Sequence, residues 1–166
     1  AFGSLRSWVC LMEAAITRGP ARLVVGSSPV PPPLPPASVL RKYICSPGSS
    51  WMVMRETLTK FGVKVSFVDT SDLEAVERAV TEKTKIVYFE TPANPTMKIT
   101  DIAAVSELAH RPKIRAVVDN TFAPPPVQFP LKLGADIVLH SITKYLNGHG
   151  DVIGGAVIGT ADDVAL

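Results

Sequence analysis

The chain has 166 residues and contains few cysteines, with only Cys10 and Cys45 present. Two cysteines do not make a disulfide framework, and they fit free thiols in a reducing compartment, so we expect a cytoplasmic protein. The three histidines, His110, His140 and His149, do not have metal-ligand spacing with either cysteine. We therefore expect no metal site.

Long hydrophobic runs are also missing from the sequence. No segment reaches the roughly 20 apolar residues that a membrane-spanning helix needs. The sequence shows no basic start followed by an apolar run and a small-residue cleavage site, the pattern of a secretory signal. We expect no membrane partner, and the start at Ala1 in place of methionine indicates a fragment or a processed product.

Acidic residues are nearly absent from the first fifty positions, which contain Glu13 as their one acidic residue and five lysines and arginines. Residues 51–166 carry 12 basic and 14 acidic residues, so the overall net charge of +2 comes only from the N-terminal part. A nucleic-acid-binding domain would need a concentrated basic surface. The charge pattern therefore predicts no nucleic-acid partner.

Proline is concentrated in one place, since seven of the 15 prolines lie between Pro20 and Pro36. Such a run excludes a helix or a central strand and favours polyproline II. Around it, Val9–Ile16 is a candidate for one or two helical turns, and Leu23–Val25 for a very short strand. The first fifty residues show no other regular pattern.

From about Trp51 the sequence alternates between helical and strand patterns. Helices are expected over Met52–Phe61 with a stop at Gly62, over Leu73–Val80, and from Ile102 with its cap at Asp101. Before the second of these helices, Ser71-Asp72 supplies a cap, and Glu74 completes a capping box with Ser71.

The expected strands are short apolar runs, and they are Val63–Val68, Ile86–Phe89, Arg115–Val118, Ile137–Leu139 and Val152–Ile158. Strands that alternate with helices at this spacing predict an α/β fold with a mostly parallel sheet. In such sheets ligands bind at the carboxyl ends of the strands. Glu90, Asp119 and Ser141 are expected at that edge.

Side chains that could bind a cofactor follow two of the expected strands. Ser141 and Thr143 place hydroxyl groups beside the amine of Lys144, a combination suited to a phosphate and to a carbonyl cofactor. Asp119 follows a buried strand directly, and its carboxylate needs a cationic partner such as a protonated pyridine nitrogen. The plainer alternatives are a surface turn with a solvated lysine and an aspartate that caps the next turn.

Three segments taken together are more specific, namely FETPANPT at 89–96, VVDNTF at 117–122 and HSITKYLNGHGDV at 140–152. In order and spacing they resemble the pyridoxal-phosphate enzymes of cysteine and methionine metabolism, the family that includes the cystathionine γ-synthases. The resemblance runs from about Leu58 to the C-terminus. It implies an incomplete fold-type-I pyridoxal-phosphate transferase large domain, with a mostly parallel sheet flanked by helices. It further implies pyridoxal 5'-phosphate as the cofactor, a small sulfur amino acid as the substrate and a homotetramer for the full-length protein.

The resemblance also assigns roles to residues of this chain. Lys144 would bind the cofactor covalently and move protons on the substrate, and Asp119 would pair with the pyridine nitrogen. Ser141 and Thr143 would hold the phosphate, and Asn94 would lie beside the ring hydroxyl. Tyrosine stacks on the ring in the family, whereas Pro47 stands at that position here.

The segments ETPANPT and NGHGDVIGG are together most similar to the methionine γ-lyase branch of the family. Enzymes of that branch convert L-methionine to methanethiol, 2-oxobutanoate and ammonia. Cystathionine γ-lyase, cystathionine γ-synthase and O-acylhomoserine sulfhydrylase chemistry are the alternatives within the family. From a different class, the chain would be a non-catalytic α/β interaction module whose Pro-rich segment binds a partner.

The chain departs from the family in its N-terminal third. Residues 1–57 match poorly, and Pro29 removes a backbone N–H from a segment similar to the phosphate loop. Our hypothesis is that part of this stretch is a misread or frameshifted version of the family sequence. Residues 58–166 would then be a partial cofactor-binding domain without the C-terminal small domain, and we expect the chain by itself to be a poor catalyst.

Overall fold

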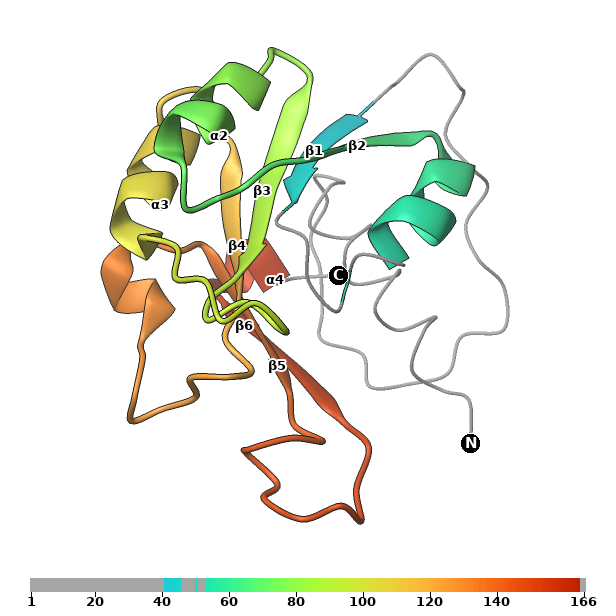
Figure 1. Ribbon diagram of the computed structural model, residues 1–166, viewed down its shortest axis with the longest axis vertical. Helices are drawn as coiled ribbons and strands as arrows, with labels where there is room; N and C mark the ends of the chain where they lie inside the picture. Colours follow the sequence, from blue (N-terminus) through green and yellow to red (C-terminus); the bar gives the residue numbers. More distant parts are fainter. Residues whose placement is uncertain (1–40, 46–49, 51–52, 165–166) are drawn as a thin grey trace.

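The computed structural model describes residues 41–45, 50 and 53–164, and its centre is a six-stranded sheet (Figure 1). The strand order is β2-β1-β3-β4-β5-β6. The strands are β1 (Arg41–Cys45), β2 (Val63–Phe67), β3 (Thr84–Glu90), β4 (Arg115–Asp119), β5 (Ile137–Ser141) and β6 (Gly155–Gly159). The first five are parallel and β6 is antiparallel to β5, which confirms the predicted mostly parallel α/β sheet.

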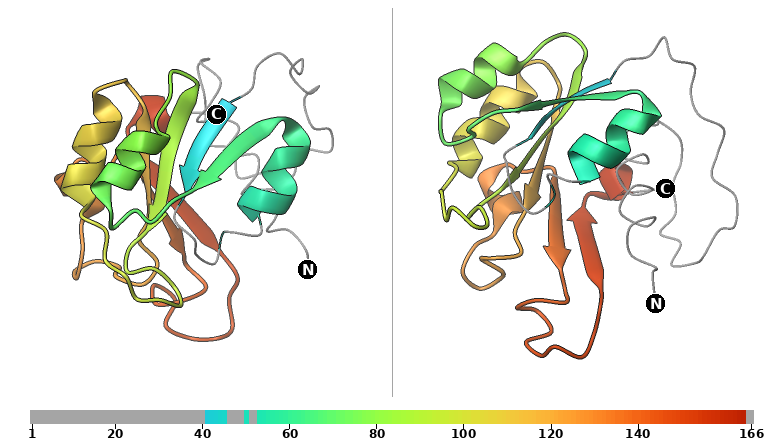
Figure 2. Two further views of the ribbon diagram at one scale, coloured as in Figure 1. Left: turned by 45° about the horizontal axis from the view of Figure 1, so that its top comes forward. Right: turned by 45° about the vertical axis from the view of Figure 1, so that its right-hand side comes forward.

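The sheet buries apolar side chains on both faces, as a central parallel sheet must. One face packs Phe89, Val118 and Val138 against α2 (Leu73–Ala79) and α3 (Ile102–His110). The opposite face packs Tyr88 and Val117 with Met54 and Leu58, which come from the short helical turns η1 (Val53–Thr57) and η2 (Leu58–Phe61). Figures 1 and 2 show these two layers on either side of the sheet.

Helix α3 forms as its sequence pattern predicts. The side chain of Asp101 accepts a hydrogen bond from the backbone N–H of Ala104, so it satisfies one of the free donors of the first turn. The apolar stripe of this helix, Ile102, Val105, Leu108 and Ala109, is buried against the sheet. The turn η2 ends at Gly62, whose φ of 73° is the left-handed conformation that glycine adopts readily.

Of the predicted Ser71-Asp72 cap, helix α2 uses Asp72 alone. Asp72, in extended conformation, accepts a hydrogen bond from the N–H of Ala75, whereas the Ser71 hydroxyl donates to Asp69. The capping box of Ser71 and Glu74 is therefore wrong, because Asp72 is one position closer to the helix and takes the cap. Glu74 forms an ion pair with Arg78 along the exposed side instead.

Strand β1 was not expected from the sequence, which shows no strand pattern over Arg41–Cys45. The strand lies between β2 and β3 and pairs with both. The last strand was expected to begin at Val152, but β6 begins at Gly155 because Val152 and Ile153 belong to the exposed loop before it. The candidate elements Val9–Ile16 and Leu23–Val25, and the prolines at 29 and 47, lie outside the described residues.

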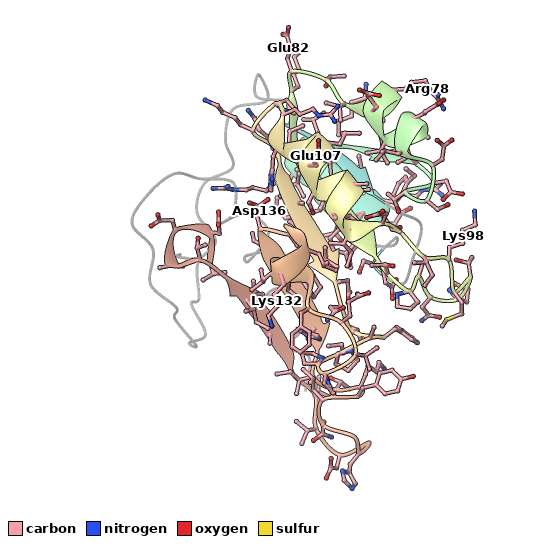
Figure 3. The ribbon with its side chains drawn as sticks, turned by 90° about the vertical axis from the view of Figure 1, so that its left-hand side faces the viewer. Arg78, Glu82, Lys98, Glu107, Lys132 and Asp136 are labelled. Atoms are coloured by element: carbon pink, nitrogen blue, oxygen red, sulfur yellow. The ribbon has the colours of Figure 1, made fainter. Side chains whose placement is uncertain are left out.

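The amino ends of β4 and β5 are joined by Asp136, which lies just before β5. Its carboxylate accepts hydrogen bonds from the backbone N–H of Ala116 at 2.8 Å, from Arg115 at 3.3 Å and from His110 Nε2 at 3.0 Å. Figure 3 shows Asp136 at this end of the sheet, with Glu107 and Arg78 on the outer surfaces of α3 and α2. No helix within the described ranges is long and apolar enough to cross a membrane.

Candidate cofactor-binding site

The carboxyl ends of three neighbouring strands meet at one edge of the sheet. Glu90 at the end of β3 pairs in register with Asp119 at the end of β4, and Asp119 pairs with Leu139 of β5. Ser141 ends β5, and its backbone N–H donates to the Thr121 hydroxyl at 2.9 Å. Figure 1 shows the turn after β3 and the long loop after β5 at this same end of the sheet. As predicted, Glu90, Asp119 and Ser141 lie together at the carboxyl edge of the sheet.

Strand alternation places these side chains on one face. Ile86, Tyr88, Val117 and Leu139 belong to the same core cluster, so Glu90, Asp119 and Ser141, two residues further along their strands, share that face. Asn120 points to the other side, where its amide oxygen accepts a 2.6 Å hydrogen bond from the Gln128 side chain. This bond links the first residue after β4 to Gln128, further along the same loop.

The carboxyl group of Asp119 is buried and is held by three hydrogen bonds. Its side chain is 7% exposed. Oδ1 accepts hydrogen bonds from the Thr121 backbone N–H at 3.0 Å and from the Thr121 hydroxyl at 2.6 Å, and Oδ2 accepts one from the Tyr88 hydroxyl at 3.1 Å. Within the described part of the chain no lysine, arginine or histidine forms an ion pair with it. The three donors replace the water that burial has removed.

A carboxylate has about four acceptor positions, two on each oxygen. The two bonds from Thr121 fill those of Oδ1, while Tyr88 fills one of the two on Oδ2. One position on Oδ2 is left for a further donor. A buried carboxylate without a cationic partner favours a positively charged donor there.

His140 interacts electrostatically with Asp119 and is therefore a candidate for that cation, but it does not supply the charge. Its side chain is 2% exposed and its Nδ1 has no hydrogen-bond partner among the described residues. Burial lowers the pKa of His140 below its ordinary value of 6.5, while the charge of Asp119 acts in the opposite direction. Because burial dominates, the imidazole stays neutral, and the positive charge that Asp119 favours has to come from elsewhere.

Lys144 lies in the tight turn that follows β5. Its backbone N–H donates to the carbonyl of Ser141 at 3.1 Å, and its own carbonyl accepts from the N–H of Gly148 at 2.9 Å. The side chain is exposed. No hydrogen bond or ion pair joins its amine to any part of the chain that the structure describes, so the amine is open to react with a carbonyl group.

The two hydroxyls beside Lys144 differ in their availability. The Thr143 hydroxyl donates to the carbonyl of Gly154 at 3.2 Å and accepts from its N–H at 3.0 Å, which closes the base of the loop between β5 and β6. Ser141 is half-buried, and its hydroxyl has no partner within residues 53–164. In this arrangement Ser141 has a proton to donate to an anion, whereas the single proton of Thr143 is directed at Gly154.

Asn94 lies in the turn after β3 and is half-buried. This turn is closed by backbone hydrogen bonds from Ala93 to Lys98 at 2.9 Å and from Met97 to Ala93 at 2.6 Å. Its side chain makes no direct contact with Asp119 or Lys144 among the hydrogen bonds of the described residues. The structure thus joins Asp119 to Ser141 through Thr121, and brings Asn94 only to the same end of the sheet.

Tyr88 and Thr121 are site residues that the sequence interpretation did not identify. The signal for Thr121 is local, because a hydroxyl two residues after an aspartate often bonds to it in a turn. Tyr88 shares a face with Glu90 by strand alternation, but its contact with Asp119 depends on β3 and β4 being neighbours. The chain order alone does not specify that pairing.

The parallel sheet, its helical layers and its polar edge are those of fold-type-I pyridoxal-phosphate enzymes. The structure of metB from Corynebacterium glutamicum matches with a TM-score of 0.70 and 43% identity, over 72% of this chain and 32% of that chain. Cystathionine gamma-lyase from Lactobacillus plantarum, complexed with L-serine, matches with a TM-score of 0.69 and 48% identity over the same shares.

Sequence comparison agrees with the structural match. The family model for Cys/Met metabolism PLP-dependent enzymes matches residues 43–166. L-methionine gamma-lyase from Fusobacterium nucleatum subsp. polymorphum is 58% identical over 112 residues, which are 67% of this chain and 28% of that protein. Cystathionine gamma-lyase from Bacillus subtilis (strain 168) is 50% identical over 111 residues, 67% of this chain and 29% of that protein.

The chain belongs to the Cys/Met metabolism family of pyridoxal-phosphate-dependent enzymes. The matched segment spans less than a third of the length of these curated relatives.

Proposed function

We propose that this chain binds pyridoxal phosphate at the carboxyl edge of its sheet and that the whole protein is a carbon–sulfur lyase acting on a sulfur amino acid. The observation that carries the proposal is the buried Asp119, which is held by three donors and has no cationic partner among the described residues. It lies on the strand next to β5, which ends at Ser141 just before Lys144. The substrate that we propose is L-methionine, which would give methanethiol, 2-oxobutanoate and ammonia. The 58% identity to L-methionine gamma-lyase supports this choice.

The side chains present fit the groups of this cofactor. The open acceptor position on Asp119 Oδ2 suits a protonated pyridine nitrogen, and the Lys144 amine suits the aldehyde carbon. Ser141 has a free hydroxyl proton for the phosphate, and Thr143 would contribute a second one after turning its proton away from Gly154. Asn94, in the turn after β3, would lie at the ring hydroxyl.

When bound, pyridoxal phosphate supplies an electron sink that stabilises negative charge at the carbon atoms next to the substrate amine. Asp119 would hold the proton on the ring nitrogen on which that sink depends. The amine of Lys144 would take the proton from the substrate Cα and then move a proton at Cβ, because it would lie at the cofactor carbonyl and can accept a proton. Loss of the γ-thiol would follow from the charge built up at Cβ.

Cofactor binding is tested with pyridoxal phosphate added to the chain. We expect an absorbance band at the edge of the visible range, and, after borohydride reduction, a mass increase confined to the peptide that contains Lys144. Lys144→Ala should abolish both signals. Lys83→Ala, a change of an exposed lysine in the turn before β3, should retain both. A wild-type chain with no band, or a label spread over several lysines, would contradict the proposal.

The substrate is tested in the protein that shows this band. Methionine, cystathionine and an O-acylhomoserine are supplied separately, while thiol, 2-oxo acid and ammonia are measured. The proposal expects methanethiol and 2-oxobutanoate in equal amounts from methionine. Turnover of cystathionine alone would assign the protein to the cystathionine branch, to which the Bacillus subtilis relative belongs by name.

A further inference from the structure

Asp119 receives its hydrogen bonds from two different sources. Thr121 belongs to the turn that follows Asp119, and its two bonds reach only Oδ1. The bond to Oδ2 comes from Tyr88 on the adjacent strand β3. Among the described residues, Tyr88 is the only donor to this carboxylate that itself lies on another strand of the sheet, and its bond is the only one to Oδ2.

Tyr88 is itself held firmly. The residue is 2% exposed and packs in the core cluster with Ile86, Val117 and Leu139, so its ring cannot change position without disturbing the core. Tyr88 lies opposite Val117 in the parallel register, two residues before Glu90, which lies opposite Asp119. This diagonal relation sets the phenol oxygen at 3.1 Å from Oδ2.

The Ser50 hydroxyl lies 2.8 Å from the same phenol oxygen. A phenol has a single proton. Since Tyr88 donates that proton to Asp119, Ser50 has to be the donor in its own bond with Tyr88. The three residues therefore form a directed series, from Ser50 to Tyr88 to Asp119, in which every proton points toward the carboxylate.

We propose that Tyr88 is a positioning residue, which fixes the rotation of the Asp119 carboxylate and directs the remaining acceptor position of Oδ2 toward a protonated aromatic nitrogen. Ser50 supports it by orienting the phenol proton. The inference rests on the proposed function, since it assumes that the ring nitrogen of pyridoxal phosphate is the donor. It concerns the orientation and firmness of Asp119, not contact between Tyr88 and the cofactor.

The test compares variants of the chain with pyridoxal phosphate as the probe. Tyr88→Phe keeps the ring and removes the hydroxyl. We expect about tenfold weaker binding of the cofactor, the usual consequence of losing one hydrogen bond to a charged group. The pH midpoint of the absorbance change should also move, because Asp119 then holds the ring proton less firmly. Ser50→Ala should weaken cofactor binding about two- to threefold and move the pH midpoint in the same direction. This variant provides the test if Tyr88→Phe does not fold.

The matched control is Thr84→Val. Thr84 is 3% exposed and lies at the opposite end of the same strand, where its hydroxyl accepts from the N–H of Thr81 at 2.9 Å. This variant also loses a buried hydroxyl, yet affinity and pH midpoint should stay at wild-type values. If Tyr88→Phe and Ser50→Ala match this control in both measurements, the positioning role is overturned while the proposed function stands. If the wild-type chain forms no Lys144-dependent band, the proposed function fails and this inference fails with it.

Discussion

At the scale of single residues, the polar edge of the sheet contains two buried carboxyl groups, Glu90 and Asp119, and one buried imidazole, that of His140. Three donors surround the carboxyl group of Asp119. His140 on the next strand has no partner for Nδ1 and loses its charge to burial. Among the described residues, Asp119 thus has hydrogen-bond donors that compensate for burial, whereas Nδ1 of His140 has no such partner.

His140 makes the stability of the chain depend on pH. Burial lowers its folded pKa below the ordinary value of 6.5, so the unfolded chain takes up a proton at a higher pH than the folded chain. The free energy of unfolding should therefore be intact above pH 6.5 and should fall below it, by at most about 1.4 kcal/mol per pH unit.

NMR titration of the His140 ring and denaturant unfolding between pH 8 and pH 5 measure this effect. The ring signals should remain those of neutral imidazole as the solution passes pH 6.5. In His140→Gln the contribution of this group to the pH dependence should disappear. A ring that titrates at its ordinary pKa would show that burial does not control it.

At the scale of elements, side-chain caps decide where the helices on the outer layer begin. Asp72 and Asp101 each accept from the N–H three residues ahead, at 3.0 Å in both helices. Local sequence identifies such caps well, because the bond spans only three residues. Where two capping residues stand side by side, as Ser71 and Asp72 do, the path of the chain from the preceding strand selects between them.

The choice of cap can be measured with two substitutions. Asp72→Ala removes the observed cap of α2 and should lower the free energy of unfolding by about 1 kcal/mol. Ser71→Ala removes only an exposed hydroxyl that bonds to Asp69, and its effect should stay within about 0.5 kcal/mol. Urea denaturation of both variants gives the comparison. Equal losses would favour the capping box that the sequence indicated.

At the scale of the whole molecule, the sheet separates two apolar clusters, and its polar groups gather at the carboxyl ends of the strands. The cluster under α2 and α3 includes Phe89, Val118 and Ile114, all fully buried. The cluster on the opposite face contains Tyr88 and Met54. Because neighbouring residues of β3 point into different clusters, the packing of the sheet and the position of Tyr88 at Asp119 depend on one another.

Phe89 shows how much the sheet depends on its core. Phe89→Ala should lower the free energy of unfolding by about 3–5 kcal/mol, because a fully buried ring leaves a cavity. A loss of that size is a large part of the stability of an ordinary domain. Phe61→Ala is the control, since Phe61 is 36% exposed, and about 1 kcal/mol is expected. Thermal and urea unfolding of both variants give the two losses in free energy of unfolding. Equal losses would contradict the central place of Phe89 in this cluster.

Much of the fold and of the candidate site could be predicted from the sequence. The apolar runs from Val63 onward predict the strands β2 to β5, because strand burial has a short and regular signature. Strand β1 was missed, since its five residues follow a proline-rich stretch and pair only with distant segments. The spacing of Asp119, Ser141 and Lys144 is a local property, and so it too could be predicted.

The sequence by itself determined the α/β class, the order of the elements and the segments that identify the family, because each depends on residues close together in the chain. Only the tertiary structure decided which strands are neighbours, and with it the contact of Tyr88 with Asp119 and of Thr121 with Ser141. These contacts join residues 31 and 20 positions apart. The physical reason is that strand pairing is set by the burial of both sheet faces together, which no single segment specifies.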